Sequence, residues 1–166
     1  GHIVNFSSMG GLATVSGVTL YAASKFAVRG FSSASSKDLA SANIAVSCFM
    51  PDAVQTPMVD LQLNFDEASM AFSGEILSLE EVEECIMNTV LVQRPVEQWL
   101  SSRAHVARFG DIFGASRAVA LAEWSMRRQG VRRQSALMEE NRNKSQISFG
   151  ASHLPDLRSA KSNNVL

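Results

Sequence analysis

Tyr21 and Lys25 form a pair whose types and spacing could move a proton. They stand four residues apart in the stretch from Leu20 to Ala27. In a helix this spacing places both side chains one turn apart on the same face. A nearby ammonium favours the phenolate form of tyrosine, so such a tyrosine can donate and accept a proton near neutral pH. The alternative interpretation is structural: a half-buried tyrosine beside a lysine whose stem covers apolar surface.

Apolar segments on both sides of this pair must position it. Residues 2–8 are largely apolar, contain no Asp, Glu, Lys or Arg, and end in two serines. They predict a buried parallel strand, as do residues 44–49 and residues 96–100. Residues 20–41 predict the helix that carries the pair. The order strand, helix, strand predicts a right-handed crossover in an α/β sheet, whose ligand site lies at the carboxyl ends of the strands.

Three motifs in this order resemble the short-chain dehydrogenase/reductase family. The family's active-site serine lies thirteen residues before its tyrosine, which here corresponds to Ser8. Its Tyr-x-x-x-Lys motif corresponds to Tyr21 and Lys25, and its Pro-Gly-x-Val-x-Thr segment is similar to residues 51–56, with Asp52 in place of the glycine. The resemblance is close over residues 1–58 and loose to about residue 128.

The resemblance implies an oxidoreductase that transfers hydride between NAD or NADP and an alcohol or carbonyl carbon. Tyr21 would pass the proton, Lys25 would assist it and hold the ribose hydroxyls, and Ser8 would donate a hydrogen bond to the substrate oxygen. The implied cofactor-binding residues are Tyr21, Lys25, Pro51, Val54 and Thr56. Ser8 and Thr56 also have a structural interpretation, as local caps. The implied fold is the C-terminal half of a Rossmann-like, doubly wound parallel sheet, with about three strands and flanking helices.

The glycine-rich turn that holds pyrophosphate in this family has no counterpart here, because Gly10, Gly11 and Gly17 have the wrong spacing. We therefore expect the chain to be part of a longer protein, with the N-terminal cofactor-binding half absent and the isolated piece inactive. A second hypothesis is a non-catalytic remnant that binds a partner through the helix at 20–41 or through an open sheet edge at 2–8. That helix forms the homodimer contact in the family, and packing within the chain is the alternative.

Residues 52–74, called the apolar loop below, follow the second strand and are rich in large apolar side chains. One interpretation is a substrate loop over an apolar alcohol or carbonyl compound, carried by Met58, Leu61 and Phe65. The other is a short amphipathic helix that covers the core.

The rest of the chain predicts helices and a tail. Ser78 and Glu81 form a capping box, and the helix it opens has an apolar stripe of Leu79, Val82, Ile86, Met87 and Val90. A helix over 103–129 would bury Val106, Phe109, Phe113, Leu121 and Trp124 against the sheet. Its arginine cluster could instead touch an anionic membrane, which we consider the weaker interpretation. We expect a partial domain over 1–133 and a flexible polar tail over 134–166.

Composition excludes several classes of function. The 166 residues have a formal net charge of -1, so no overall field attracts nucleic acid. Cys48 and Cys85 lie in apolar segments and predict reduced thiols, and the three histidines lack the spacing of metal ligands. We find no secretory signal and no apolar run of about 18 residues. A cytoplasmic protein without a metal is the expectation.

Overall fold

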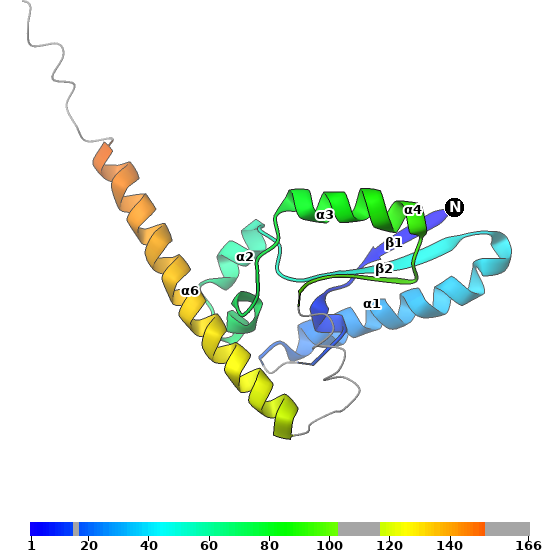
Figure 1. Cartoon of the computed structure of the whole chain (residues 1–166), viewed down its shortest axis with the longest axis horizontal. Coiled ribbons are helices and arrows are strands. Elements are labelled where there is room, and N and C mark those ends of the chain that lie inside the picture. Colours follow the sequence, from blue (N-terminus) through cyan, green and yellow to red (C-terminus); the bar gives the residue numbers. More distant parts are fainter. Residues whose placement is uncertain (15–16, 103–116, 152–166) are drawn as a thin grey trace, which may run out of the picture.

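The computed structural model describes residues 1–14, 17–102 and 117–151. Its centre is a parallel sheet of β1 (His2–Phe6), β2 (Ala45–Pro51) and β3 (Glu97–Leu100), in the order β1-β2-β3 (Figure 1). Phe6 pairs with Phe49 across the first ladder, and Cys48 pairs with Glu97 across the second. Three parallel strands with flanking helices confirm the predicted fold class. β2 continues to Pro51, two residues past the predicted end.

Helix α1 (Thr19–Asp38) connects β1 to β2 and packs against β2. It is followed by the short 3-10 helix η2 (Ala40–Ala42) and by Asn43, whose φ of 55° turns the chain into β2. Across the sheet, the Arg29 guanidinium on α1 forms an ion pair with Glu97 of β3, with Nε 2.8 Å from Oε1. Helix α1 is therefore linked to both edge strands of the described sheet, to β1 through the chain and to β3 through this ion pair.

The central strand β2 supplies most of the first core cluster. Cys48 and Met50 are fully buried against Leu12, which follows the 3-10 helix η1 (Met9–Gly11). On the neighbouring strand, the ring of Phe6 stands edge-on to Phe49 at 5.5 Å between centroids. Figure 1 shows α1 and α3 on opposite sides of the sheet. A central strand that is covered on both faces needs the nearly continuous apolar run seen in its sequence.

A second core cluster lies under the apolar loop, which folds into α2 (Pro57–Gln62) and the 3-10 helix η3 (Asp66–Phe72). Val59, Leu63 and Phe72 form this cluster, and Leu137 of the long helix α6 (Arg117–Ala151) packs against it. Figure 1 shows α6 lying beside α2 and continuing past it.

The course of α6 corrects two predictions. The helix packs on η3 rather than on the sheet, and Leu121 and Trp124, predicted to be buried, are 66% and 55% exposed. The tail predicted from residue 134 is wrong over 134–151, which are helical. Glu, Arg, Lys, Gln and Ala favour helices even without an apolar stripe, so polarity alone does not indicate a tail. The predicted residues Val106, Phe109 and Phe113 and the range 152–166 lie outside the described residues.

Helix α3 (Leu79–Cys85) begins with the predicted capping box, since Ser78 accepts from the Glu81 amide and Glu81 accepts from the Ser78 amide. It continues as a π-helical segment, η4 (Ile86–Val90), and as α4 (Leu91–Gln93). The predicted apolar stripe is only partly buried: Val90 is fully buried, whereas Leu79 and Met87 are 59% and 54% exposed. A π turn holds more residues than an α turn, so a count based on 3.6 residues fails there.

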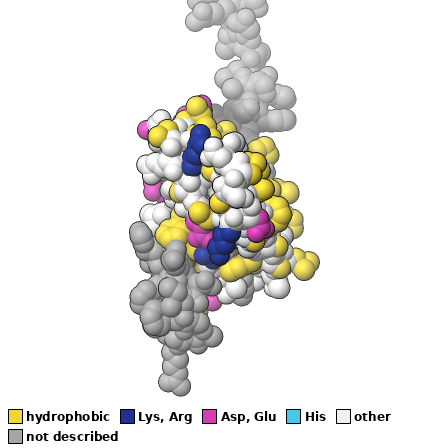
Figure 2. Space-filling view, turned by 90° about the vertical axis from the view of Figure 1, so that its right-hand side faces the viewer, with side chains coloured by type: hydrophobic (Ala, Val, Ile, Leu, Met, Phe, Trp, Pro, Cys, Tyr) yellow, Lys and Arg dark blue, Asp and Glu magenta, His cyan; other side chains and the backbone are white. Residues whose placement is uncertain are grey.

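Strand β1 lies at the edge of the described sheet, as predicted for residues 2–8. Ile3 and Phe6 stay 44% and 52% exposed on it. Hydrophobic side chains also gather along one flank of the face that Figure 2 presents. An apolar edge strand readily pairs with another strand, so a partner at this edge stays a prediction.

The two cysteines are free thiols in different surroundings, with Cys48 buried and Cys85 partly buried. Burial raises the pKa of both thiols above the ordinary value for cysteine. We expect a disulfide reagent at about pH 8 to label Cys85 in the folded protein, and to label Cys48 only as the fold opens. Cys85→Ser should remove the fast phase of labelling, and fast labelling that survives this change would contradict the assignment.

The described residues offer neither a cluster of metal ligands nor a membrane-spanning helix. Among them, no three His, Cys, Asp or Glu side chains gather closely enough to hold a metal ion. None of the described helices is long and apolar enough to span a bilayer. His2 lies 2.8 Å from the Ser47 hydroxyl through Nε2; burial, followed by the charges of Arg94 and of the N-terminus, lowers its pKa. His105 and His153 lie outside the described residues.

Candidate active site

Ser8 and Tyr21 border the same glycine just beyond the end of β1. Ser8 is the N-cap of η1, where its hydroxyl accepts a hydrogen bond from the Gly10 amide at 3.1 Å. A Cβ built on Gly10 would lie 3.0 Å from Cε1 of Tyr21 and 3.7 Å from Oγ of Ser8. The absent side chain at Gly10 therefore leaves room between a hydroxyl and a phenol. Tyr21 remains 41% exposed, so its ring can be reached from solvent.

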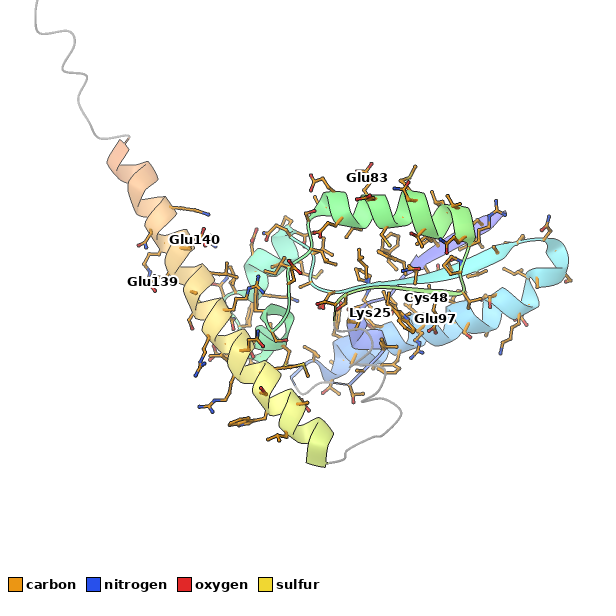
Figure 3. All side chains as sticks on the ribbon, in the orientation of Figure 1. Lys25, Cys48, Glu83, Glu97, Glu139 and Glu140 are labelled. Atoms are coloured by element: carbon orange, nitrogen blue, oxygen red, sulfur yellow. The ribbon has the colours of Figure 1, made fainter. Side chains whose placement is uncertain are left out.

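Lys25 lies one turn after Tyr21 on α1, and its ammonium is close to the Tyr21 ring. Its Nζ lies 5.7 Å from the centroid of the Tyr21 ring. It also donates to the carbonyl oxygen of Phe6, the last residue of β1, at 3.4 Å. Figure 3 shows Lys25 where α1 meets the sheet. The structure thus places a hydroxyl, a phenol and an ammonium near the carboxyl end of β1, and their catalytic roles stay a prediction.

The two adjacent serines at the end of β1 have different positions. Ser7 is 4% exposed, and its hydroxyl donates to the carbonyl oxygen of Lys25 at 2.8 Å. Gly11 makes this packing possible, because a Cβ there would lie 2.7 Å from the same carbonyl oxygen. Ser7 therefore fastens α1 to the sheet, whereas Ser8 faces the space beside Tyr21. No pattern in the sequence indicates this role of Ser7.

Pro51, Val54 and Thr56 lie at or beyond the carboxyl end of β2, the neighbour of β1. Val54 forms an isolated parallel bridge with Leu77. Thr56 is the N-cap of α2, and its hydroxyl donates to the carbonyl oxygen of Val54 at 3.2 Å. All three therefore share the sheet edge of the Tyr21 site. Thr56 makes the local contact foreseen in its structural interpretation, and a cofactor role stays a prediction.

Asp52, which replaces the family's glycine, is held by two hydrogen bonds. Its Oδ1 accepts from the Ala53 amide at 3.0 Å, and its Oδ2 accepts from the Ser101 hydroxyl at 2.6 Å. Ser101 directly follows β3. The carboxylate thus ties the end of β2 to the end of β3, a role that sequence reasoning missed because the two residues are far apart in the chain.

The apolar loop has a packed side and an exposed side. Met58, Leu61 and Phe65, the predicted substrate-loop residues, are 61%, 61% and 52% exposed. The loop also lies close to the beginning of α1: a Cβ on Gly17 would be 3.0 Å from the carbonyl oxygen of Glu67. The two interpretations therefore apply to different residues, since the buried ones cover a core and the exposed ones remain available. Contact with a substrate stays a prediction.

The similarity to known proteins covers part of this chain. Residues 1–65 match the family model described as short chain dehydrogenase. A diacetyl reductase ((S)-acetoin forming) of Staphylococcus aureus is 45% identical over 60 residues, which cover 36% of this chain and 23% of that protein. A cyclopentanol dehydrogenase of a Comamonas species is 42% identical over 77 residues, or 46% of this chain and 31% of that protein. A 3-oxoacyl-(acyl-carrier-protein) reductase of Chlamydia muridarum is 48% identical over 58 residues, or 35% and 23%.

The matched region is the one that builds the candidate site. Residues 1–65 contain β1, α1, β2 and α2, and with them Ser8, Tyr21 and Lys25. The aligned segments span less than a third of each of these relatives. Residues 1–65 are therefore similar to a segment of the short chain dehydrogenase family.

Proposed function

We propose that residues 1–65 form the catalytic part of an oxidoreductase that uses NAD or NADP to interconvert an alcohol and a ketone or aldehyde. The observation that carries this proposal is the approach of Ser8 and Tyr21 to Gly10 at the end of β1, with the Lys25 ammonium over the Tyr21 ring. The names of the relatives support a small alcohol or carbonyl compound as substrate, because they refer to diacetyl and to cyclopentanol.

Each side chain of the site has a separate task in this proposal. Tyr21 gives its phenolic proton to the substrate oxygen during reduction and takes it back during oxidation. Lys25, one turn away, holds its positive charge beside the Tyr21 ring and can hydrogen-bond the ribose hydroxyls. Ser8 donates a hydrogen bond to the oxygen as negative charge develops on it. The nicotinamide cofactor, when bound, supplies or accepts the hydride.

The residues at this sheet edge fit the nicotinamide half of such a cofactor. The Lys25 ammonium and the Tyr21 phenol are donors for ribose hydroxyls, and Pro51, Val54 and Thr56 lie at the end of the adjacent strand. Asp52 is engaged with Ala53 and Ser101, so its carboxylate is held by protein donors. No glycine-rich turn for the adenosine half occurs in the sequence, and residues 1–166 alone are expected to give no turnover.

A chimera tests the proposal directly. The 60-residue segment of this chain would replace its counterpart in the Staphylococcus aureus diacetyl reductase, to which it is 45% identical. The host supplies the remaining strands, so we expect oxidation of NADH or NADPH in the presence of diacetyl, well above the rate of a mock reaction. The native host protein is the positive control. A chimera with a native-like circular dichroism spectrum and no turnover would contradict the proposal.

A second candidate function is an interaction module that associates through α1. Ala23, Ala27, Gly30 and Ala34 are all exposed in the described chain, and their spacing places them on one side of the helix. Packing of this face within the described chain is therefore not observed, which favours a homo-oligomer contact through α1. Under this hypothesis the chain self-associates in solution, while the folded chimera stays inactive.

A further inference from the structure

The inner side of α6 is attached to the apolar loop by a buried glutamine. Gln134 is 2% exposed, and its side-chain Nε2 donates to the carbonyl oxygens of Leu63 at 2.9 Å, Phe65 at 3.1 Å and Gln62 at 3.3 Å. Gln62 and Leu63 lie at the C-terminal end of α2, and Phe65 directly precedes η3. The carbonyl oxygens of Gln62 and Phe65 also accept from backbone amides, so Gln134 supplies a further donor where α2 ends. Gln134 therefore caps α2 from another helix, across 71 positions of sequence.

Neighbouring residues of α6 extend this attachment along the loop. Gly130 lies one turn before Gln134, and a Cβ there would be 2.0 Å from the carbonyl oxygen of Ser69, so the backbones of α6 and η3 touch. Arg133 donates through Nη1 to the carbonyl oxygen of Gly74. Leu137 packs on the cluster beneath the loop. Four residues on successive turns of α6 thus hold the loop over most of its length.

The capped carbonyls stand beside the exposed apolar side chains. Leu61 immediately precedes Gln62, and Phe65 itself supplies one of the three carbonyls. Because Gln134 holds the backbone at these points, it also sets where the side chains of Leu61 and Phe65 leave the backbone. The contact between Gly17 and Glu67 brings the same loop against the chain that leads into Tyr21.

We infer that Gln134 is a positioning residue: through it, α6 holds the backbone that carries the exposed apolar side chains of Leu61 and Phe65, which form one wall of the substrate site. Contacts of Gln134, Arg133 and Leu137 attach α6 to the loop. The assignment of the wall to a substrate site rests on the proposed function. The substrate class that suits such a wall is an alcohol or ketone with an aliphatic or cyclic body.

Hydrogen exchange measured by mass spectrometry on the whole chain tests the attachment. Gln134→Met keeps the length of the side chain and removes its two N–H donors. We expect amides in 57–74 to exchange about tenfold faster, because the lost hydrogen bonds no longer oppose local opening. Gln129→Met is the matched control, since Gln129 is an exposed glutamine on the same helix, and it should leave exchange unchanged. Unchanged exchange in 57–74 for Gln134→Met, or an equal increase in β2, would overturn the inference.

Kinetics test the link to substrate separately. In an active chimera that carries this chain through residue 151, Gln134→Met should raise KM for a cyclic ketone several-fold, with kcat nearly unchanged, because the chemistry at Tyr21 is intact. Gln129→Met should change neither constant. Faster exchange without any change in KM would overturn the substrate-wall part alone, and a chimera without turnover would refute the oxidoreductase proposal while the exchange result still decides the attachment.

Discussion

Tyr21→Phe should lower the turnover of the active chimera by about 100- to 10,000-fold, which is the usual contribution of a general acid or base. The substitution removes only the phenolic oxygen. The ring remains beside Gly10, and the Lys25 ammonium keeps its position near the ring face. Lys25 keeps its contacts and only the phenolic hydrogen bond to the ribose is lost, so the affinity for NAD(P)H should fall by at most about tenfold. Initial rates and a fluorescence titration of the cofactor measure the two quantities.

Ser24→Ala is the matched control for this experiment. Ser24 lies in the same turn of α1, and its exposed hydroxyl donates to the carbonyl oxygen of Tyr21 at 2.7 Å. The change also deletes one hydroxyl group, but one that the proposal keeps out of the proton transfer. We expect nearly normal turnover for Ser24→Ala. Substantial turnover by the Tyr21→Phe chimera would remove Tyr21 from its assigned role and with it the main support for the proposed mechanism.

Gly130→Ala should lower the free energy of unfolding by roughly 1–3 kcal/mol, the usual range for overpacking a close contact. Helix propensity alone would favour alanine by about 1 kcal/mol. The new Cβ would stand 2.0 Å from the carbonyl oxygen of Ser69, which is a backbone atom and cannot rotate away. The steric cost therefore exceeds the gain in propensity, and α6 must move off η3. Urea denaturation of the whole chain measures the difference.

Gly30→Ala, on α1, should change the free energy of unfolding in the opposite direction. Gly30 lies in the interior of α1, and nothing comes within 4 Å of a Cβ built on it. Only helix propensity acts there, so the substitution should raise the free energy of unfolding by about 0.5–1 kcal/mol. A low protein concentration keeps any association through α1 out of the comparison. If Gly130→Ala raised the free energy of unfolding as Gly30→Ala does, the contact with Ser69 would not govern the packing of α6.

The sheet and the Tyr21 site could be predicted because their signals are local. Short apolar runs bounded by serine, asparagine and proline identified β1 and β2, and the spacing of Tyr21 and Lys25 specifies a shared helix face in any helix. Ser8 required the family spacing as well, since the sequence by itself does not distinguish it from Ser7. The structure separates them by burial.

The course of α6 could not be predicted, because the contacts that fix it are distant in sequence and polar. Gln134 looks like a surface residue in a polar stretch, and only the folded chain brings it to Leu63. The same holds for Asp52 with Ser101 and for Arg29 with Glu97, which are 49 and 68 positions apart. Hydrophobic periodicity carries no information about such pairs, so neither their existence nor their partners follow from the pattern.

The glutamine cap on α2 also has a thermodynamic consequence. Gln134 connects α6 to α2. Anything that stabilises one of these helices therefore also stabilises the other, and the coupling free energy is the same in both directions. A ligand that binds to Leu61 and Phe65 should therefore slow the local unfolding of α6. A partner that detaches α6 from the loop should lower the affinity for that ligand by the same factor. The far end of a helix outside the sheet could in this way control the occupancy of a site that it never touches.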